Sequence, residues 1–130
     1  MANVPEELRY SKDHEWVAFD ESSGVATVGI TDYAQGELGD VVFVELPAVG
    51  ETVSAHSACG TIEAVKAVAE LFAPVSGEVV DANVTLEDHP ETLNVDPYGD
   101  GWMIRIHLSD RGEIDDLMDA AGYVEHIGET

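Results

Sequence analysis

Lys66 is the residue of this sequence whose type and surroundings suggest chemistry. The chain has only two lysines, Lys12 and Lys66, against 27 aspartates and glutamates. The four residues nearest to Lys66 are alanines and valines, so nothing bulky or charged crowds its ammonium group. A modifying enzyme could convert such an accessible amine into an amide, and the attached group would then do the chemistry. A lysine without a chemical role is the alternative, because exposed lysines are common.

The pattern around Lys66 predicts a β-hairpin with the lysine at its tip. Apolar runs lead in over residues 58–63 and lead out over residues 71–73, as expected for two strands that meet at a reversal. The motif Pro-x-x-Gly-Glu-x-Val occurs at residues 47–53 and again at 74–80, on either side of the lysine. The two copies indicate an internally duplicated β structure that displays Lys66 at one end.

Local patterns elsewhere predict the elements that hold this hairpin. Turn chemistry in the sequence DESSG separates two strand-like runs. Thr31 or Asp32 can cap a short helix that stops at Gly39. We expect a hairpin over residues 15–19 and 25–30, the short helix near residues 32–38, and an apolar strand over residues 41–46.

The last third of the chain predicts turns, one strand and a helix. Residues 85–101 are rich in Pro, Gly, Asp and Asn and indicate turns with one short strand near residues 93–95. Apolar residues alternate over residues 102–108, which predicts a half-buried strand. Apolar residues at helical spacing over 114–121 predict a C-terminal helix, interrupted by Gly122, that packs on a β core.

Composition excludes several classes of function. The net charge of −22 repels phosphates and argues against a nucleic-acid partner. The acids are spread along the chain, as on a folded acidic surface, whose self-repulsion is screened at high salt. We therefore expect a cell with a salty interior, such as a halophilic archaeon. No apolar run is long enough for a membrane span and Cys59 is the single cysteine, so we expect one soluble, cytoplasmic domain over residues 1–130.

Catalytic and metal-binding motifs are missing from the sequence. No two of the five histidines stand at a metal-ligand spacing beside a cysteine or a carboxylate pair, so no metal is expected. No nucleophile elbow, phosphate-binding loop or dinucleotide fingerprint occurs. The sequence therefore favours a carrier or a binding protein over an enzyme.

Several ordered blocks make the chain resemble the H-protein family of the glycine cleavage system. The blocks are HEW at residues 14–16, GITDYAQ at 29–35, LGDVVFVELP at 38–47, EAVKA at 63–67, APVSGEVV at 73–80 and DGWMIRI at 100–106. Together they cover nearly the whole chain. The family pattern around the modified lysine is usually ESVKA, and Ala64 replaces the serine here.

This resemblance implies a mainly β barrel-sandwich hybrid, with lipoate attached to Lys66 as N6-lipoyllysine. Such a carrier shuttles the aminomethyl group of glycine from a pyridoxal-phosphate (PLP) glycine decarboxylase to a tetrahydrofolate-dependent aminomethyltransferase. The FAD enzyme dihydrolipoyl dehydrogenase then reoxidises the arm, which a lipoylating enzyme attaches. One alternative is an H-like protein that relays lipoate or only binds. Another is a related carrier, but biotin carriers have methionines where Val65 and Ala67 stand, and 2-oxo acid dehydrogenase lipoyl domains are shorter, with aspartate before the lysine.

Three acidic residues complete the predicted site. An aminomethylated thiol is labile, so a carboxylate in a dry cleft would shelter its cationic amine. We assign this role to Glu15, in the HEW block, and to Glu70 as a second candidate. Glu63 is expected to help a lipoylating enzyme to recognise the hairpin. Because the chain has 27 acids, a solvated surface charge is the alternative for each of the three.

Overall fold

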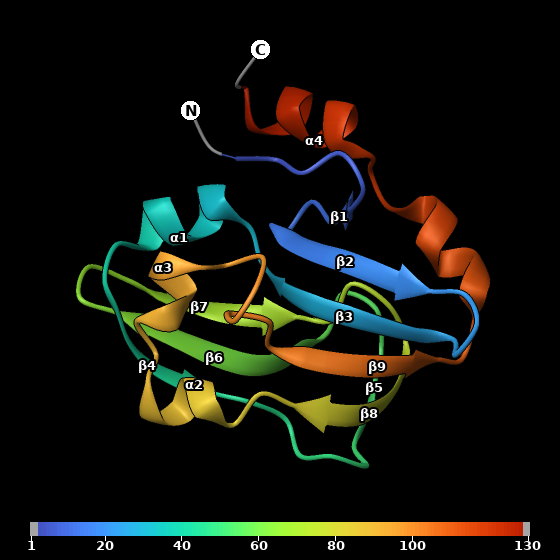
Figure 1. The fold of residues 1–130 in the computed structure, drawn as a ribbon, viewed down its shortest axis with the longest axis horizontal. Coiled ribbons are helices and arrows are strands. Elements are labelled where there is room, and N and C mark those ends of the chain that lie inside the picture. The colour runs from blue at the N-terminus through green and yellow to red at the C-terminus, as the bar shows by residue number, and fades with distance from the viewer. Residues whose placement is uncertain (1–2, 129–130) are drawn as a thin grey trace.

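A computed structural model describes residues 3–128 and shows two antiparallel sheets flanked by short helices (Figure 1). The six-stranded sheet has the order β1-β2-β3-β9-β8-β5, and the three-stranded sheet has the order β4-β6-β7. The prediction of a mainly β fold is confirmed. The strands are β1 (Arg9–Tyr10), β2 (Glu15–Asp20), β3 (Val25–Ile30), β4 (Val41–Glu45), β5 (Thr52–Val53), β6 (Ala58–Ala64), β7 (Val68–Phe72), β8 (Gly77–Ala82) and β9 (Ile104–Leu108). The helices are α1 (Asp32–Leu38), α2 (Thr85–Asp88), α3 (Thr92–Val95), a 3₁₀ helix (Arg111–Asp116) and α4 (Ala120–Ile127).

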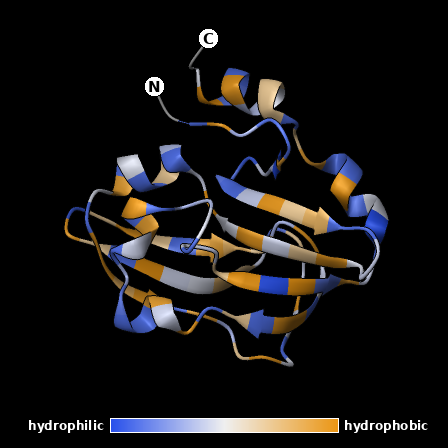
Figure 2. Cartoon of the chain, in the orientation of Figure 1, coloured by the Kyte–Doolittle hydropathy of each residue, from blue (hydrophilic) through white to orange (hydrophobic). Residues whose placement is uncertain are grey.

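Alternating side chains bring the two sheets onto one apolar core. Along β9, buried apolar residues alternate with Arg105 and His107, which are not buried, and the hydropathy colours alternate in the same way (Figure 2). Both sheets contribute to the same buried cluster, which includes Val28, Val44, Ile62 and Ile106. Burial of each such side chain stabilises the fold by roughly 1.5–3 kcal/mol. The half-buried strand predicted over residues 102–108 is confirmed as β9, which lies inside the sheet between β3 and β8.

The two copies of the repeated motif lie side by side. β5, from the first copy, pairs antiparallel with β8, from the second, in the register Thr52↔Glu78 and Val53↔Gly77. The hairpin between β6 and β7, which carries Lys66, lies at the other end of the molecule (Figure 1).

The hairpin and the short helix predicted in the first third are confirmed. β2 and β3 pair along their whole length. Thr31 caps α1, since its hydroxyl accepts a hydrogen bond from the Ala34 amide at 3.2 Å. Gly39 ends α1 with a φ of 79°, a conformation that glycine adopts without strain.

The strand predicted near residues 93–95 is wrong, because these residues belong to the helical turn α3. The Asp96 amide closes the turn on the Thr92 carbonyl at 2.9 Å. Leu93 is fully buried, so a single turn places it in the core without a partner strand. A short apolar run does not distinguish these two structures.

The C-terminal helix is interrupted at Met118 rather than at Gly122. Met118 and Tyr10 exchange two backbone hydrogen bonds of 2.8 Å, which hold the chain extended between the 3₁₀ helix and α4. Asp119 then caps α4 by accepting a hydrogen bond from the Gly122 amide at 2.8 Å. Gly122 therefore lies in the first turn of α4 and does not end a helix.

Candidate functional site

Lys66 lies in the turn between β6 and β7, and it is exposed. The Ala64 amide closes the turn by donating to the Ala67 carbonyl at 2.8 Å. The Val65 amide donates to the Asp40 carbonyl at 3.0 Å, which ties the turn to the neighbouring loop. The hairpin predicted around Lys66 is confirmed, and it presents the amine on a fixed backbone.

The loop between α1 and β4 supports the Lys66 side chain. A Cβ atom built on Gly39 would lie 2.8 Å from Lys66 Cε, so the lysine stem packs where a side chain is absent. Asn94 of α3 holds this loop, because its Nδ2 donates to the Gly39 carbonyl at 2.8 Å and its Oδ1 accepts from the Val41 amide at 2.9 Å. Sequence reasoning missed Asn94, since these contacts join residues that are distant along the chain.

A cleft of about 270 Å³ lies beside this hairpin, between α1 and the start of β2. Leu38 in its wall immediately precedes Gly39, and Ala69 in the opposite wall follows Lys66 by three residues. Lys66 is therefore next to the cleft. The lining combines an apolar surface, formed by Ile30, Leu38, Ile62 and Ala69, with polar groups that include His14 and Glu15.

Glu15 is a buried carboxyl in the wall of the cleft, with only 2% of the residue exposed. It accepts hydrogen bonds from the Ser11 hydroxyl at 2.6 Å and from the Phe72 amide at 3.3 Å. Burial raises the pKa of Glu15 to about 8, and the charge of Asp13 acts in the same direction. At neutral pH this carboxyl therefore holds its proton, and a cation that entered the cleft would lower its pKa and favour ionisation.

The other two predicted acids are exposed and lie in different places. Glu70 is at the edge of the cleft. The strand register puts Glu63 on the outer face of the sheet, between Phe43 of β4 and Val68 of β7. The structure thus brings Glu15 and Glu70 to the cleft beside Lys66 and leaves Glu63 outside it.

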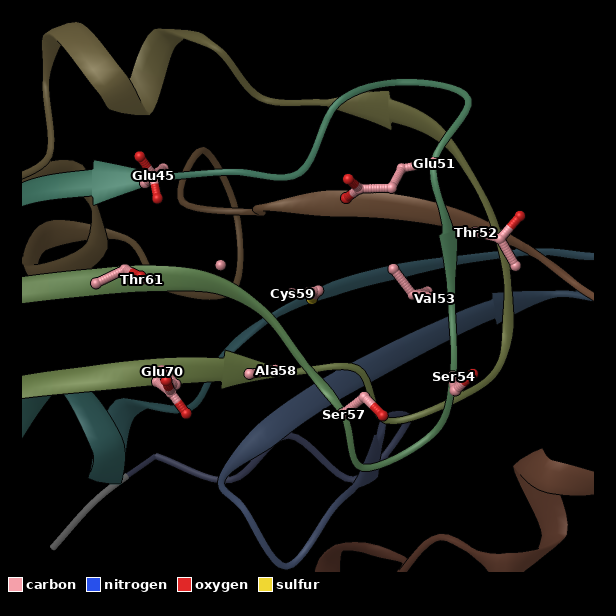
Figure 3. A pocket seen from close by; sticks show the side chains of 11 residues that line it. Glu45, Glu51, Thr52, Val53, Ser54, Ser57, Ala58, Cys59, Thr61 and Glu70 are labelled. Carbon is pink, nitrogen blue, oxygen red and sulfur yellow. The ribbon is translucent and has the colours of Figure 1, made fainter.

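A second cavity, of about 500 Å³, lies on the outer face of the same sheet (Figure 3). Glu45, Thr61 and Glu70 line it from three neighbouring strands. Cys59 also lines this cavity, and burial raises the pKa of its thiol to about 12. The thiol is therefore protonated and a poor nucleophile at neutral pH. Glu70 borders both cavities.

His14 and Tyr123 are functional candidates that sequence reasoning missed. His14 lines the cleft, and its Nδ1 atom shares a hydrogen bond of 2.9 Å with the hydroxyl of Tyr123 in α4. His14 belongs to the HEW block, which is the one signal that pointed to this position. Nothing local to Tyr123 indicates the contact, because 109 residues of chain separate the two.

Within residues 3–128, no three His, Cys, Asp or Glu side chains gather as a metal site. None of the helices in this part of the chain is both long enough and apolar enough to cross a membrane. The second lysine, Lys12, is also exposed, but it lies in the turn before β2. It is therefore not part of the β4-β6-β7 sheet, whose hairpin displays Lys66.

A lysine exposed on a fixed β-hairpin, beside a cleft with a buried carboxyl, is the geometry of a carrier protein, in which the lysine amine can take a covalently attached group. The family described as "Glycine cleavage H-protein" matches residues 8–130. The chain belongs to this family and is the lipoyl-carrier component of the glycine cleavage system rather than one of its enzymes.

Similar proteins cover nearly the whole length of the chain. The glycine cleavage system H protein of Marinobacter nauticus is 50% identical over 127 residues, which are 98% of this chain and 97% of the relative. That of Halorhodospira halophila is 52% identical over 129 residues, 99% and 98% of the two chains. The crystal structure of the H protein from Mycobacterium marinum is 42% identical, with a TM-score of 0.87 over 96% of this chain and 99% of that one. This match confirms the barrel-sandwich hybrid fold.

Proposed function

We propose that Lys66 carries lipoate as N6-lipoyllysine and that the chain shuttles the aminomethyl group of glycine. The observation that carries this proposal is the exposed Lys66 amine on a fixed hairpin beside the cleft. When attached, the lipoyl group supplies a disulfide that takes up the aminomethyl group and is restored after the group has been passed on. The proposed partners are the PLP-dependent glycine decarboxylase, the tetrahydrofolate-dependent aminomethyltransferase, dihydrolipoyl dehydrogenase and a lipoylating enzyme.

The cleft suits the arm of such a carrier. Ile30, Leu38 and Ile62 provide apolar surface, which binds an aliphatic chain by removing it from water. Glu15 provides a carboxyl that is already desolvated. We assign the shelter of the cationic amine to Glu15, with Glu70 at the edge of the cleft as the second group. A buried carboxylate beside an ammonium group is favoured over either charge left unpaired.

We assign the binding of partner enzymes to the surface around Lys66. Val65 and Val68 are 72% and 66% exposed, and Phe43 is 44% exposed. These three residues form an apolar rim on a chain that is otherwise strongly acidic. Glu63 lies between Phe43 and Val68 in the sheet, and we assign it to recognition by the lipoylating enzyme.

The acidic surface supports a salty cytoplasm as the working environment, which we propose for this chain. Within residues 3–128, Arg105 is the one arginine or lysine that forms an ion pair, with Asp81 at 3.0 Å. Most of the 27 acids therefore have no cationic partner. Repulsion among such charges is screened as the salt concentration rises.

Mass analysis of the protein purified from its own host tests the carrier function. We expect the mass increment of one lipoyl group, mapped to a peptide within residues 60–80. The variant Lys66→Arg should lose this increment, whereas the control Lys12→Arg should keep it. An unmodified Lys66 in cells that are oxidising glycine would contradict the proposal and favour the alternative, an H-like protein that relays lipoate or only binds.

A further inference from the structure

We infer that Tyr123, on the C-terminal helix, is a positioning residue for the cleft, because its hydroxyl bridges His14, which lines the cleft, and Thr31, which caps the lining helix α1. The inference deepens the proposed role of the cleft as a shelter for the loaded arm, and it rests on that role for its effect on function. The bridge itself is a separate claim about this chain, and it can be tested without the arm.

The two partners of the Tyr123 hydroxyl belong to two segments that meet at one end of the cleft. The hydroxyl is 2.9 Å from His14 Nδ1, and His14 lines the cleft next to Glu15. It is 2.7 Å from the Thr31 hydroxyl, which caps the lining helix α1. The Tyr123 oxygen therefore links the side chains of two residues whose backbones are already joined, because the Thr31 amide donates to the His14 carbonyl at 3.0 Å.

Packing holds the Tyr123 ring in a fixed place. Tyr123 is fully buried, and its ring stacks on Tyr10 with the centroids 4.7 Å apart and an angle of 13° between the planes. The backbone pairing of Tyr10 with Met118 fixes the chain that leads into α4. The direction of the hydroxyl is thus fixed by the stacked Tyr10 ring and by the backbone pairing of Tyr10 with Met118.

The hydrogen bonds of the bridge have one direction that satisfies every buried proton. Among the contacts of the described residues, the Tyr123 oxygen is the acceptor available to the buried Thr31 hydroxyl, so in this arrangement Thr31 donates to Tyr123 and accepts from the Ala34 amide. Tyr123 then donates to His14 Nδ1. Burial raises the pKa of Tyr123 and lowers the pKa of His14, so the phenol keeps its proton and the imidazole is neutral. A neutral imidazole that accepts at Nδ1 carries its proton on Nε2.

His14 keeps an uncommon backbone conformation at the bridge. Its φ is 72°, in the left-handed region that residues with a Cβ seldom occupy. The His14 carbonyl accepts from the Thr31 amide at 3.0 Å, and the side chain is held by Tyr123. Such a conformation persists where surrounding contacts determine it. Here it accompanies the placement of His14 in the cleft wall.

The test of the bridge uses the full-length, unmodified protein and nitrogen NMR of its histidine rings. In the wild type, we expect the neutral His14 ring to carry its proton on Nε2. In Tyr123→Phe, which keeps the buried ring, we expect a mixture of the two tautomers. The matched control is Tyr10→Phe, which removes the other hydroxyl of the same stacked pair, one that bonds to the Pro5 carbonyl and not to the cleft. This control should leave the His14 tautomer unchanged.

The effect on function is measured as the lifetime of the lipoylated protein loaded with the aminomethyl group from glycine. We expect Tyr123→Phe to shorten this lifetime about fivefold, the factor that corresponds to the net contribution of one hydrogen bond. Tyr10→Phe should behave as the wild type. The rings near His14 and the charges that act on it, His126, Asp13 and Glu37, are present in all three proteins.

Two results would overturn the inference. The first is a neutral wild-type His14 ring with its proton on Nδ1, because the ring would then donate to Tyr123 and the hydrogen bonds of the bridge would run in the other direction. This result can be observed in the wild type alone. The second is a Tyr123→Phe protein with an unchanged tautomer and an unchanged lifetime. A wild type that loses the aminomethyl group as fast as Glu15→Ala would instead refute the proposed shelter, and the NMR result would still decide whether the bridge exists.

Discussion

The aliphatic part of the Lys66 side chain lies against the backbone of Gly39, the residue that ends α1. A Cβ atom at Gly39 would be 2.8 Å from Lys66 Cε, which is closer than real Cβ contacts, and the φ of Gly39 is +79°. The same loop is fixed by Asn94 and by the hydrogen bond from the Val65 amide to Asp40. The end of the short helix therefore determines where the lysine stem can lie.

Replacing Gly39 by alanine should impair lipoylation of Lys66. The new methyl group displaces the lysine stem, and the left-handed backbone costs about 1–2 kcal/mol of stability for a residue with a Cβ. We expect a severalfold lower rate of modification by the lipoylating enzyme, measured by intact mass over time. Gly50→Ala is the matched control, because Gly50 has a φ of +96° but nothing within 4 Å of its Cβ position. Equal rates for the two variants would show that contact with Gly39 does not matter.

Replacing Glu15 by glutamine should flatten the dependence of stability on pH. The pKa of Glu15 is near 4.5 when unfolded and about 8 in the folded protein. Between these values the folded state binds more protons than the unfolded state, so stability falls as pH rises through this window. The loss from this group approaches about 1.4 kcal/mol per pH unit.

Urea unfolding of the wild type and of Glu15→Gln between pH 5 and pH 8 measures this difference. We expect the unfolding free energy of the wild type to fall relative to that of Glu15→Gln as pH rises. Glu63→Gln is the control, because this variant also removes one carboxyl group, but an exposed one. A constant gap between wild type and Glu15→Gln across this range would mean that Glu15 is ionised in the folded protein throughout.

The sequence predicted the parts of the site that depend on neighbours along the chain. The hairpin around Lys66 and the helix that ends at Gly39 follow from short-range patterns of apolar, capping and turn residues. The interruption at Met118 was not predictable in this way, because it results from pairing with Tyr10 across the fold. Glu15 was assigned from its place in the HEW block, and its burial became visible only in three dimensions.

Replacing Phe43 by serine should weaken the binding of partner enzymes. Phe43 is 44% exposed in the apolar rim, and truncating one of the few aromatic anchors that carry most of the energy of an interface costs more than about 1 kcal/mol. We expect the KM for the lipoylated protein, as the substrate of the aminomethyltransferase, to rise about fivefold to tenfold. Val49→Ser is the control, because Val49 is 62% exposed in the segment between β4 and β5, and this segment turns at the end of the molecule away from the β6-β7 hairpin (Figure 1). If the two variants raised the KM equally, the apolar rim would not be the binding surface.

Folding of the protein should strengthen with salt. The net charge is −22, and added KCl shortens the screening length from about 10 Å at 0.1 M to about 3 Å at 1 M. We expect the thermal midpoint to rise by about 5–10 °C between these concentrations, roughly 1–2 kcal/mol for a chain of this size. Asp115 and Asp116 are adjacent and exposed, so the double variant Asp115→Asn and Asp116→Asn should be more stable than the wild type at low salt. The advantage of this variant should shrink at 1 M KCl, because screening already weakens the repulsion that the variant removes. A wild-type midpoint that did not rise with KCl would contradict the proposed adaptation to a salty cytoplasm.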